Sequence, residues 1–407
     1  MKAKRRVVVT GIGVVTSIGI GKDAFWQNAL QGKSGISEVS IDTSNYRCHK
    51  AGEVKDFNPE DFIAKRKIKF LGRSSQLAIA ASYLAMKDAK LPLRNITKSE
   101  MAVIVGTTTG ERPLEELVAT WVKGGLKDID RVRILQASVN NISANVGIQF
   151  KAMGPNYLIP TACASGNYAI GYGFDLIRSG GSSFVLAGGA DAFSTVAFAG
   201  FQRIYAMAPE KCQPFDKNRK GMMQGEGAGI LFLESLESAV KRGAEIYAEI
   251  SGYGLSCDAY HATAPDPKGI AKVMQKALNE AGLTYKDVDY ISAHGTGTAT
   301  NDKVECQAIK EVLKERYKEV PVTSIKSMLG HPMGAASAIE AATCCLIIKN
   351  GMIPPKINYE TPDPECDIDC VPNKARKQEV KVALNNGFAF GGNNACVVFK
   401  RWSKSSA

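Results

Sequence analysis

The cysteine most suited to covalent chemistry is Cys163, in the segment TACASG (161–166). An apolar, strand-like segment ends just before it, and a helix is expected to begin just after it. At a helix N-terminus the partial positive charge and free N–H groups are expected to lower the pKa of a thiol. The same N–H groups can hold a carbonyl oxygen as it becomes negatively charged. The competing interpretation is a small cysteine that is buried for packing.

Histidine is scarce, with four in the chain, so its placement is informative. His294 follows the apolar segment DYIS (289–292), and His331 follows PVTSI (321–325). Sheets of α/β proteins place ligands at the carboxyl ends of their strands, which is where both histidines are expected. A structural role is the alternative for each histidine alone. His261 is a weaker candidate for the same pocket, and His49 is assigned to the surface.

Short β-branched segments alternate with helical ones, which predicts α/β layers around a buried sheet. The second half also repeats the first. Segment 248–254 echoes the opening strand, 290–298 echoes 103–110, 321–351 echoes 156–180, and 382–392 weakly echoes 184–191. We therefore predict two unequal halves, residues 1–245 and 246–407, with extra material in the first half near residues 110–155 and 193–226. The repeat places His331 where Cys163 lies in the first half, so a pseudo-twofold axis would bring both to one site, joined by His294.

Composition limits the possible partners and compartments. The 51 Lys and Arg against 40 Asp and Glu give a net charge of +11, which implies an acidic partner: nucleic acid, an anionic membrane or an acidic carrier protein. No apolar run approaches the roughly 20 residues that span a bilayer. The apolar N-terminal segment is cut by four glycines, which favours a strand and turn over a signal peptide. The ten cysteines are therefore expected to be reduced, in the cytoplasm.

Three segments resemble ligand-binding motifs but each lacks residues that the motif requires. GIGVVTSIG (11–19) lacks the GxGxxG spacing of a dinucleotide site. GEGAG (225–229) has no following GK[ST], so we expect tight packing there instead of a phosphate loop. Cys366 and Cys370 have a CxxxC spacing but no set of four ligands, so no metal is predicted.

Taken together, the motifs resemble the β-ketoacyl-acyl carrier protein synthases of the elongating, synthase II type. The resemblance runs nearly end to end and is carried by RVVVTGIGVVTSIG, TACASG, PFDKNRKGMMQGEGAG, DAYHATAPDP, AHGTGT, SIKSMLGH and FAFGGNNA. It implies the thiolase fold, a duplicated five-layered αβαβα architecture with two pseudo-equivalent halves. It also implies a homodimer, with a heterodimer formed with a chain-length subunit as the open alternative. An acidic acyl carrier protein is the implied partner, and no nucleic acid is expected.

The resemblance implies a decarboxylative Claisen condensation. Cys163 would hold an acyl chain as a thioester, and malonyl-carrier protein would lose CO2 to give the enolate that attacks it. His294 and His331 would stabilise the negative charge. Lys326, paired with Glu340, would fix the electrostatics around them. No cofactor would be bound, because the substrates arrive on the phosphopantetheine arm of the carrier protein.

The remaining site residues are also implied by the resemblance. The backbone N–H groups of Cys163 and Phe390 would form an oxyanion hole, and Phe390 would be the gate. The phosphopantetheine arm would bind Thr296 and Thr298. The other two groups are an acyl channel, Phe201 and Thr108, and a docking patch for the carrier protein, Lys65, Arg66 and Lys69.

Several departures leave the pathway open. Ala389 stands where the ordinary fatty-acid enzymes have glycine, and FAFGGNN and HGTGT look more like ketosynthases of polyene-type and other specialised type II systems. The alternatives are thus fatty-acid elongation and a specialised type II polyketide, polyene or unusual-lipid pathway. A coenzyme A thiolase would need a second cysteine in the C-terminal glycine loop, which has none. A chain-length partner subunit would lack the nucleophile.

Overall fold

The computed structural model describes residues 5–91 and 101–403, and its core is one continuous sheet of eleven strands. The first half contributes β1 (Val7–Thr16), β2 (Gly19–Ile20), β5 (Met101–Gly106), β6 (Asn156–Ile159), β7 (Phe184–Asp191) and β8 (Gly227–Ser235). The second half contributes β9 (Ala248–Cys257), β10 (Tyr290–Ser292), β11 (Val322–Thr323), β14 (Val382–Phe388) and β15 (Asn393–Lys400).

The two halves of the sheet share one topology. The strand orders are β6-β5-β7-β8-β1 and β11-β10-β14-β15-β9, and β1 pairs with β9 where the halves meet. In each half the first three strands are parallel and the last two are antiparallel to their neighbours. This identity confirms the duplication predicted from the sequence. The domain boundary near residue 245 stays a prediction, because the sheet is continuous there.

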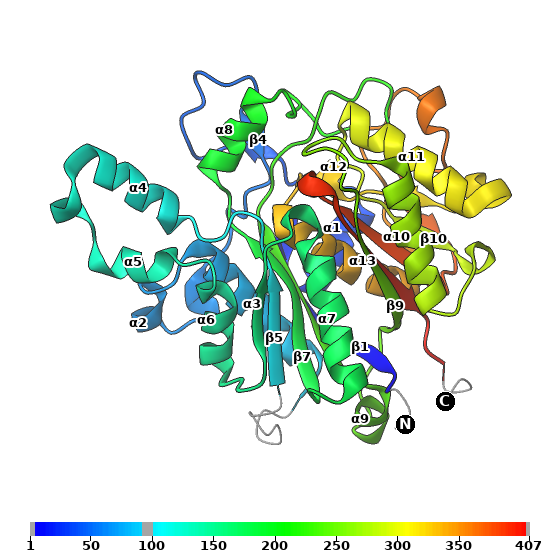
Figure 1. Cartoon of the computed structure of the whole chain (residues 1–407), viewed down its shortest axis with the longest axis horizontal. Coiled ribbons are helices and arrows are strands. Elements are labelled where there is room, and N and C mark those ends of the chain that lie inside the picture. The colour runs from blue at the N-terminus through cyan, green and yellow to red at the C-terminus, as the bar shows by residue number, and fades with distance from the viewer. Residues whose placement is uncertain (1–4, 92–100, 404–407) are drawn as a thin grey trace.

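The two halves of the sheet form two layers, and helices form the other three (Figure 1). The central helices α7 (Ser165–Ser179) and α13 (Ala336–Asn350) pack against strands of both halves. On the outer face of the first half lie α3 (Arg73–Asp88) and α6 (Asn141–Phe150). On the outer face of the second half lie α10 (Pro267–Glu280) and α11 (Ala299–Leu313). The five-layered αβαβα architecture expected from the sequence is confirmed.

Small residues make the central layer possible. Helix α13 is buried from Ala336 to Ile348. It approaches α7 so closely that a Cβ on Gly166 would lie 2.7 Å from the backbone nitrogen of Ala338. The runs of Ala, Ser and Gly in both helices are thus required by packing, whatever the chemistry.

The remaining elements lie around this core. Short strands are β3 (Ser37–Glu38), β4 (Lys50–Ala51), β12 (Met352–Ile353) and β13 (Arg376–Lys377). Further helices are α1 (Lys22–Leu30), α2 (Lys65–Ile68), α8 (Thr195–Arg203), α9 (Leu236–Lys241) and α12 (Lys326–Leu329). No helix in the part of the chain that the structure describes combines the length and apolar character needed to cross a membrane.

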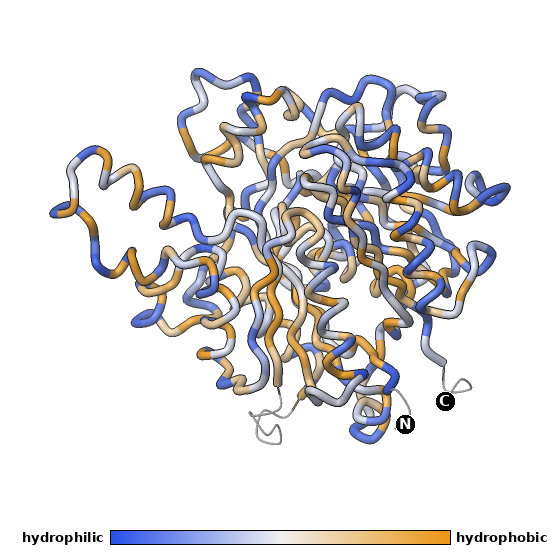
Figure 2. The backbone as a smooth tube through the Cα atoms, viewed as in Figure 1, coloured by the Kyte–Doolittle hydropathy of each residue, from blue (hydrophilic) through white to orange (hydrophobic). Residues whose placement is uncertain are grey.

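A helical arm projects from the body of the first half (Figure 1). It consists of α4 (Pro113–Gly124) and α5 (Arg131–Ala137), within the extra material that the sequence predicted for this half. Hydrophobic segments occur along the arm although it lies outside the core (Figure 2). Trp121 and Val122 are 58% and 75% exposed.

Candidate active site

A pocket of about 590 Å³ opens where turns from both halves of the sheet meet. These turns follow the carboxyl ends of β5, β6, β10 and β14. They supply Thr108, Cys163, His294 and Phe390 to the lining, and His331 comes from the loop after α12. The structure therefore brings together the nucleophile and both histidines that the sequence singled out.

Cys163 lies in a sharp turn at the start of α7. The turn is a 3-10 segment, Ala162–Ala164, and Ala162 has a positive φ of 49°. The matching turn before α13, Met333–Ala335, begins with a φ of 46° at Met333. By this match the counterpart of Cys163 is Gly334, which corrects the predicted equivalence with His331. The inserted helix α12 lengthens the second loop, so His331 reaches the site from just before the equivalent turn.

The three reactive side chains lie in contact range of one another. One donor atom each of Cys163, His294 and His331 lies within 4.8 Å of the other two. The histidine rings are perpendicular, with centroids 5.4 Å apart. Nδ1 of His294 and both ring nitrogens of His331 are buried with no hydrogen-bond partner among the described residues. Thiolate and imidazole also suit Zn²⁺, so these three are the residues that could hold a metal.

Buried partners hold the turn that carries His294. Glu305 accepts hydrogen bonds from the backbone nitrogens of His294 and Gly295, each at 2.8 Å. Nζ of Lys326 donates to the carbonyl oxygen of His294 at 2.7 Å and forms a buried ion pair with Glu340. The structure thus shows the Lys326–Glu340 pair, whereas Glu305 was missed. Its place in the second turn of α11 gave no sign that it reaches the site.

The backbone of His331 is held on both sides by a neighbouring loop. Its nitrogen donates to the carbonyl oxygen of Met223 at 2.6 Å, and its carbonyl oxygen accepts from Gly225 at 2.9 Å. A Cβ on Gly225 would lie 2.6 Å from the carbonyl oxygen of Leu329. Tight packing near the site, expected of the GEGAG segment, is therefore present.

Burial sets the protonation of the site. It lowers the pKa of His294 and of His331 well below 6.5, and the nearby Lys326 charge adds to this effect. Both imidazoles are therefore neutral near pH 7. Burial raises the pKa of the Cys163 thiol to about 12, although Lys326 opposes the shift. The expectation of a lowered thiol pKa was wrong, because loss of solvent around the sulfur outweighs the favourable charges.

The turn that carries Thr108 is fixed by another buried carboxylate, that of Asp191. Asp191 accepts hydrogen bonds from the backbone nitrogens of Thr108 and Thr109, at 2.7 and 2.9 Å, and from that of Gly334 at 2.6 Å. Asp191 thereby joins the turn that carries Thr108 to the turn before α13. Asp191 was not predicted from the sequence, although its position at the end of a buried strand was a signal that could have indicated it.

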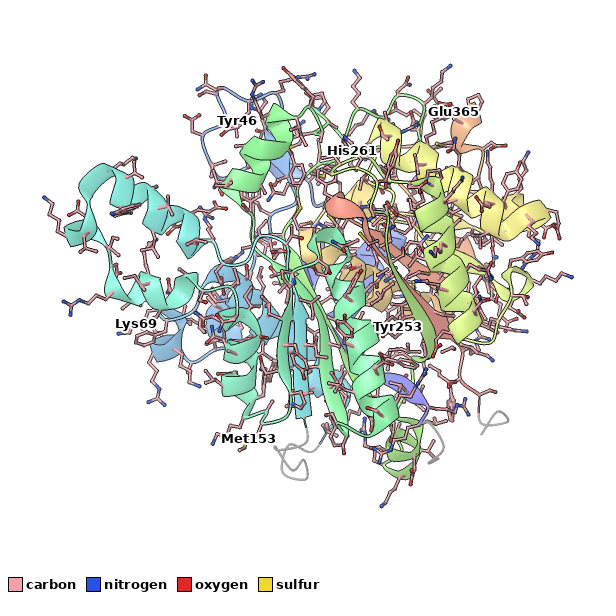
Figure 3. The ribbon with its side chains drawn as sticks, in the orientation of Figure 1. Tyr46, Lys69, Met153, Tyr253, His261 and Glu365 are labelled. Atoms are coloured by element: carbon pink, nitrogen blue, oxygen red, sulfur yellow. The ribbon has the colours of Figure 1, made fainter. Side chains whose placement is uncertain are left out.

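The mouth of the pocket carries the predicted gate and arm-binding residues. Phe390 is 44% exposed, and its ring centroid lies 6.0 Å from that of Phe201. The hydroxyls of Thr296 and Thr298 are hydrogen bonded at 2.9 Å. His261 also lines the pocket, on the exposed loop labelled in Figure 3.

Other predicted residues lie outside the pocket. Lys65, Arg66 and Lys69 are exposed on and beside α2, and Figure 3 labels Lys69 at the side of the molecule that carries the arm. His49 is half-buried and bonded to Thr43. Of the nine cysteines other than Cys163, eight are buried and Cys257 is exposed.

Comparisons with known proteins agree with this architecture. Residues 4–239 match the family model for the beta-ketoacyl synthase N-terminal domain, and residues 247–360 match that for the C-terminal domain. A 3-oxoacyl-[acyl-carrier-protein] synthase 2 from Staphylococcus aureus strain N315 is 41% identical over 412 residues, covering 99% of this chain and all of the relative. A protein of the same name from Synechocystis is 40% identical over 98% of this chain and 99% of the relative.

Solved structures add further neighbours. The ishigamide ketosynthase/chain length factor superposes with a TM-score of 0.96 at 43% identity, over 98% of this chain and all of that one. A type II polyketide ketosynthase, solved with its acyl-carrier protein and bound to the hexaketide, gives 0.90 at 34% identity with the same coverage. A beta-ketoacyl synthase from Burkholderia phymatum gives 0.90 at 33% identity, again over 98% of this chain and all of that one.

Proposed function

This chain belongs to the beta-ketoacyl synthase family, and from that premise we propose how its pocket performs the condensation. The protein is an acyltransferase, a 3-oxoacyl-[acyl-carrier-protein] synthase of the thiolase fold. The observation that carries the mechanism is the convergence of Cys163, His294 and His331 within 4.8 Å. A nucleophile and two neutral imidazoles at one point suit acyl transfer followed by decarboxylation.

In the first half-reaction Cys163 attacks the thioester of acyl-carrier protein. The cysteine sulfur forms a bond to the acyl carbon, and the phosphopantetheine sulfur leaves and takes up a proton. Because the thiol is protonated at rest, its proton passes to a neighbouring neutral imidazole as the sulfur attacks. The backbone N–H groups of Cys163 and Phe390, each in a tight turn at the pocket, hold the oxyanion of the tetrahedral intermediate.

In the second half-reaction malonyl-carrier protein loses CO2. The electrons of the broken carbon–carbon bond pass into the thioester, whose oxygen becomes negative. His294 and His331 donate hydrogen bonds to that oxygen, since a neutral imidazole has one N–H group. The resulting carbanion attacks the acyl group on Cys163, releases the cysteine sulfur and leaves a β-ketoacyl chain on the carrier. The Lys326–Glu340 pair, through the carbonyl oxygen of His294, keeps that ring in place.

The mouth of the pocket orients the substrates. Thr296 and Thr298 hydrogen bond to the phosphopantetheine arm, and the ring of Phe390 controls entry to a channel lined by Phe201 and Thr108. The chemistry requires no resident cofactor or metal, because the carrier brings each acyl group as an activated thioester.

Surface features support the partners that we propose. The exposed cluster Lys65, Arg66 and Lys69 and the net charge of +11 favour docking of an acidic carrier protein. We also propose a homodimer in the cytoplasm. Strand β6 is an edge of the sheet, and beside it lies a groove of about 600 Å³ that includes Tyr157, Ile159, Tyr172 and Leu176. An open strand edge beside an apolar groove favours pairing with a second copy.

A second candidate function is condensation in a specialised type II polyketide, polyene or unusual-lipid pathway. The likeness to the ishigamide ketosynthase/chain length factor, at 43% identity, favours it. The chemistry at Cys163 would be the same, and only the acyl chain would differ. A degradative thiolase is disfavoured, because the C-terminal glycine loop contains no cysteine and Cys396, which follows it in sequence, is buried within β15.

The test is a condensation assay with acyl- and malonyl-carrier protein, in which the product is identified by mass. Cys163→Ala is expected to abolish β-ketoacyl product while the protein remains folded, because the sulfur that carries the acyl group is gone. Cys257→Ala, which removes an exposed cysteine, is the matched control and should retain full activity. Undiminished product from Cys163→Ala would overturn the assignment.

A further inference from the structure

One wall of the pocket comes from helix α8 and the turn after it. Phe201, Ile204 and Tyr205 all line the pocket, and Phe201 packs against the ring of Phe390. The position of α8 therefore sets the width of the channel beside the gate.

Few contacts hold α8 against the body of the protein. Within α8, which the structure describes completely, Phe198 alone is buried. Its ring packs on Tyr46 and Phe193, with centroids 5.7 and 5.3 Å away. The side chain of Gln202 bonds the backbone of Cys48, donating to its carbonyl oxygen at 2.9 Å. A helix anchored at so few points depends on how its N-terminus is held.

The N-terminus of α8 is held by Glu115, which belongs to α4 in the arm. One carboxylate oxygen accepts from the hydroxyl of Ser194. The other accepts from the backbone nitrogens of Thr195 and Val196, at 3.1 and 3.4 Å. A carboxylate at this position satisfies free N–H groups and complements the helix dipole.

We propose that Glu115 is a positioning residue that ties the arm to α8 and so fixes the acyl channel for long acyl chains. The inference rests on the proposed function, since it concerns the channel that would receive the acyl chain. Because the arm projects from the body, a displacement of the arm would be transmitted through Glu115 to α8 and so to the pocket.

The adjacent residue supplies a matched control. Glu116 lies on the same helix but bonds within the arm, to Arg112 at 3.4 Å and to Arg133. Removing Glu116 should change the arm's own ion pairs and leave α8 in place. Glu115→Gln provides a graded variant, because its amide keeps one oxygen as an acceptor.

The test measures access to Cys163 with N-alkyl iodoacetamides, one carrying a short and one a long alkyl group. The readout is the ratio of the two alkylation rates, which does not require carrier protein or turnover. Glu115→Ala is expected to change this ratio about 5-fold while the short reagent reacts as before, an effect the size of one capping interaction. The first two N–H groups of α8 lose their acceptor, whereas the cap from Ser194 to Ala197 remains. Glu115→Gln should fall between, and Glu116→Ala should match the unchanged protein.

A parallel measurement separates this proposal from the proposed function. Glu115→Ala should raise the KM for long acyl-carrier protein and leave malonyl decarboxylation unchanged. If Glu115→Ala and Glu116→Ala give the same alkylation ratio, the positioning role is overturned, even while the unchanged protein condenses normally. Equal losses with both reagents would also overturn it, because they would indicate general disruption. A changed alkylation ratio in a protein that never condenses would instead support the positioning role and contradict the proposed function.

Discussion

At the residue scale, the chemistry depends on three side chains that burial keeps neutral. Their identities could be predicted from the sequence, because Cys163, His294 and His331 each follow a strand-like segment. The protonation states of these side chains could not be predicted from the sequence. The pKa of Cys163 depends on loss of solvent caused by residues distant in sequence, and this outweighs the local effect of the helix N-terminus. Glu305 and Asp191 were missed for a related reason, since each acts through backbone groups of another turn, and for Asp191 one of these groups lies 143 residues away at Gly334.

The two histidines should matter more for decarboxylation than for loading of Cys163. His294→Ala or His331→Ala is expected to slow CO2 release from malonyl-carrier protein by about 100-fold or more, because each removes a donor to the developing oxyanion. Acyl transfer to Cys163 should fall less, since the other imidazole still accepts a proton. Both half-reactions can be followed separately, with His49→Ala as a control. Equal loss of the two half-reactions would contradict these roles.

At the element scale, the duplication was visible because each half repeats the same strands and turns. The identical strand order of the two halves confirms it. The exact register was not visible, since α12 lengthens the loop that carries His331 and shifts that residue relative to Cys163. The arm was predicted only as extra sequence, because a helical pair that packs little against the core has no buried face to reveal its orientation.

The start of helix α3 is held by a titratable side chain, Glu111, which gives a pH-dependent prediction. Glu111 accepts from the backbone nitrogens of Ser74 and Ser75 at the start of α3, and burial raises its pKa from 4.5 to about 7. Between these values the folded protein keeps a proton that the unfolded chain has released. The stability that Glu111 contributes should therefore fall as the pH rises.

Glu111→Gln tests this, because glutamine does not titrate. The free energy of unfolding of the unchanged protein, minus that of Glu111→Gln, should decrease by about 3 kcal/mol at most between pH 5 and pH 8. Denaturant unfolding at a series of pH values provides the measurement, with Glu116→Gln as a half-exposed control. A difference that is constant with pH, or that increases, would show that Glu111 has no raised pKa.

At the scale of the whole molecule, the resemblance and the comparisons identify the chemistry, and the surfaces indicate how substrate arrives. The basic residues on and beside α2 and the open edge at β6 lie on the first half of the chain. Neither surface could be located from spacing alone, because exposure depends on which strand ends the sheet and which helix covers it.

The basic patch should bind carrier protein electrostatically. Charge reversal at Lys65 and Lys69 to glutamate is expected to weaken carrier binding at least about 10-fold at low salt, with a smaller effect as ionic strength rises and screens the charges. Binding can be measured by titration at two salt concentrations. Lys217, exposed on another loop, is the control. Unchanged affinity of the charge-reversed variant for carrier protein would show that the carrier docks on another surface.

The most direct test of the central claim is the mass of the peptide that contains Cys163. Incubation with acyl-carrier protein alone is expected to add one acyl group to Cys163 and nowhere else. Subsequent malonyl-carrier protein should return that peptide to the free thiol and yield a β-ketoacyl carrier two carbons longer. An unmodified Cys163, an acyl group on another residue, or an acyl group that malonyl-carrier protein does not discharge would contradict the account.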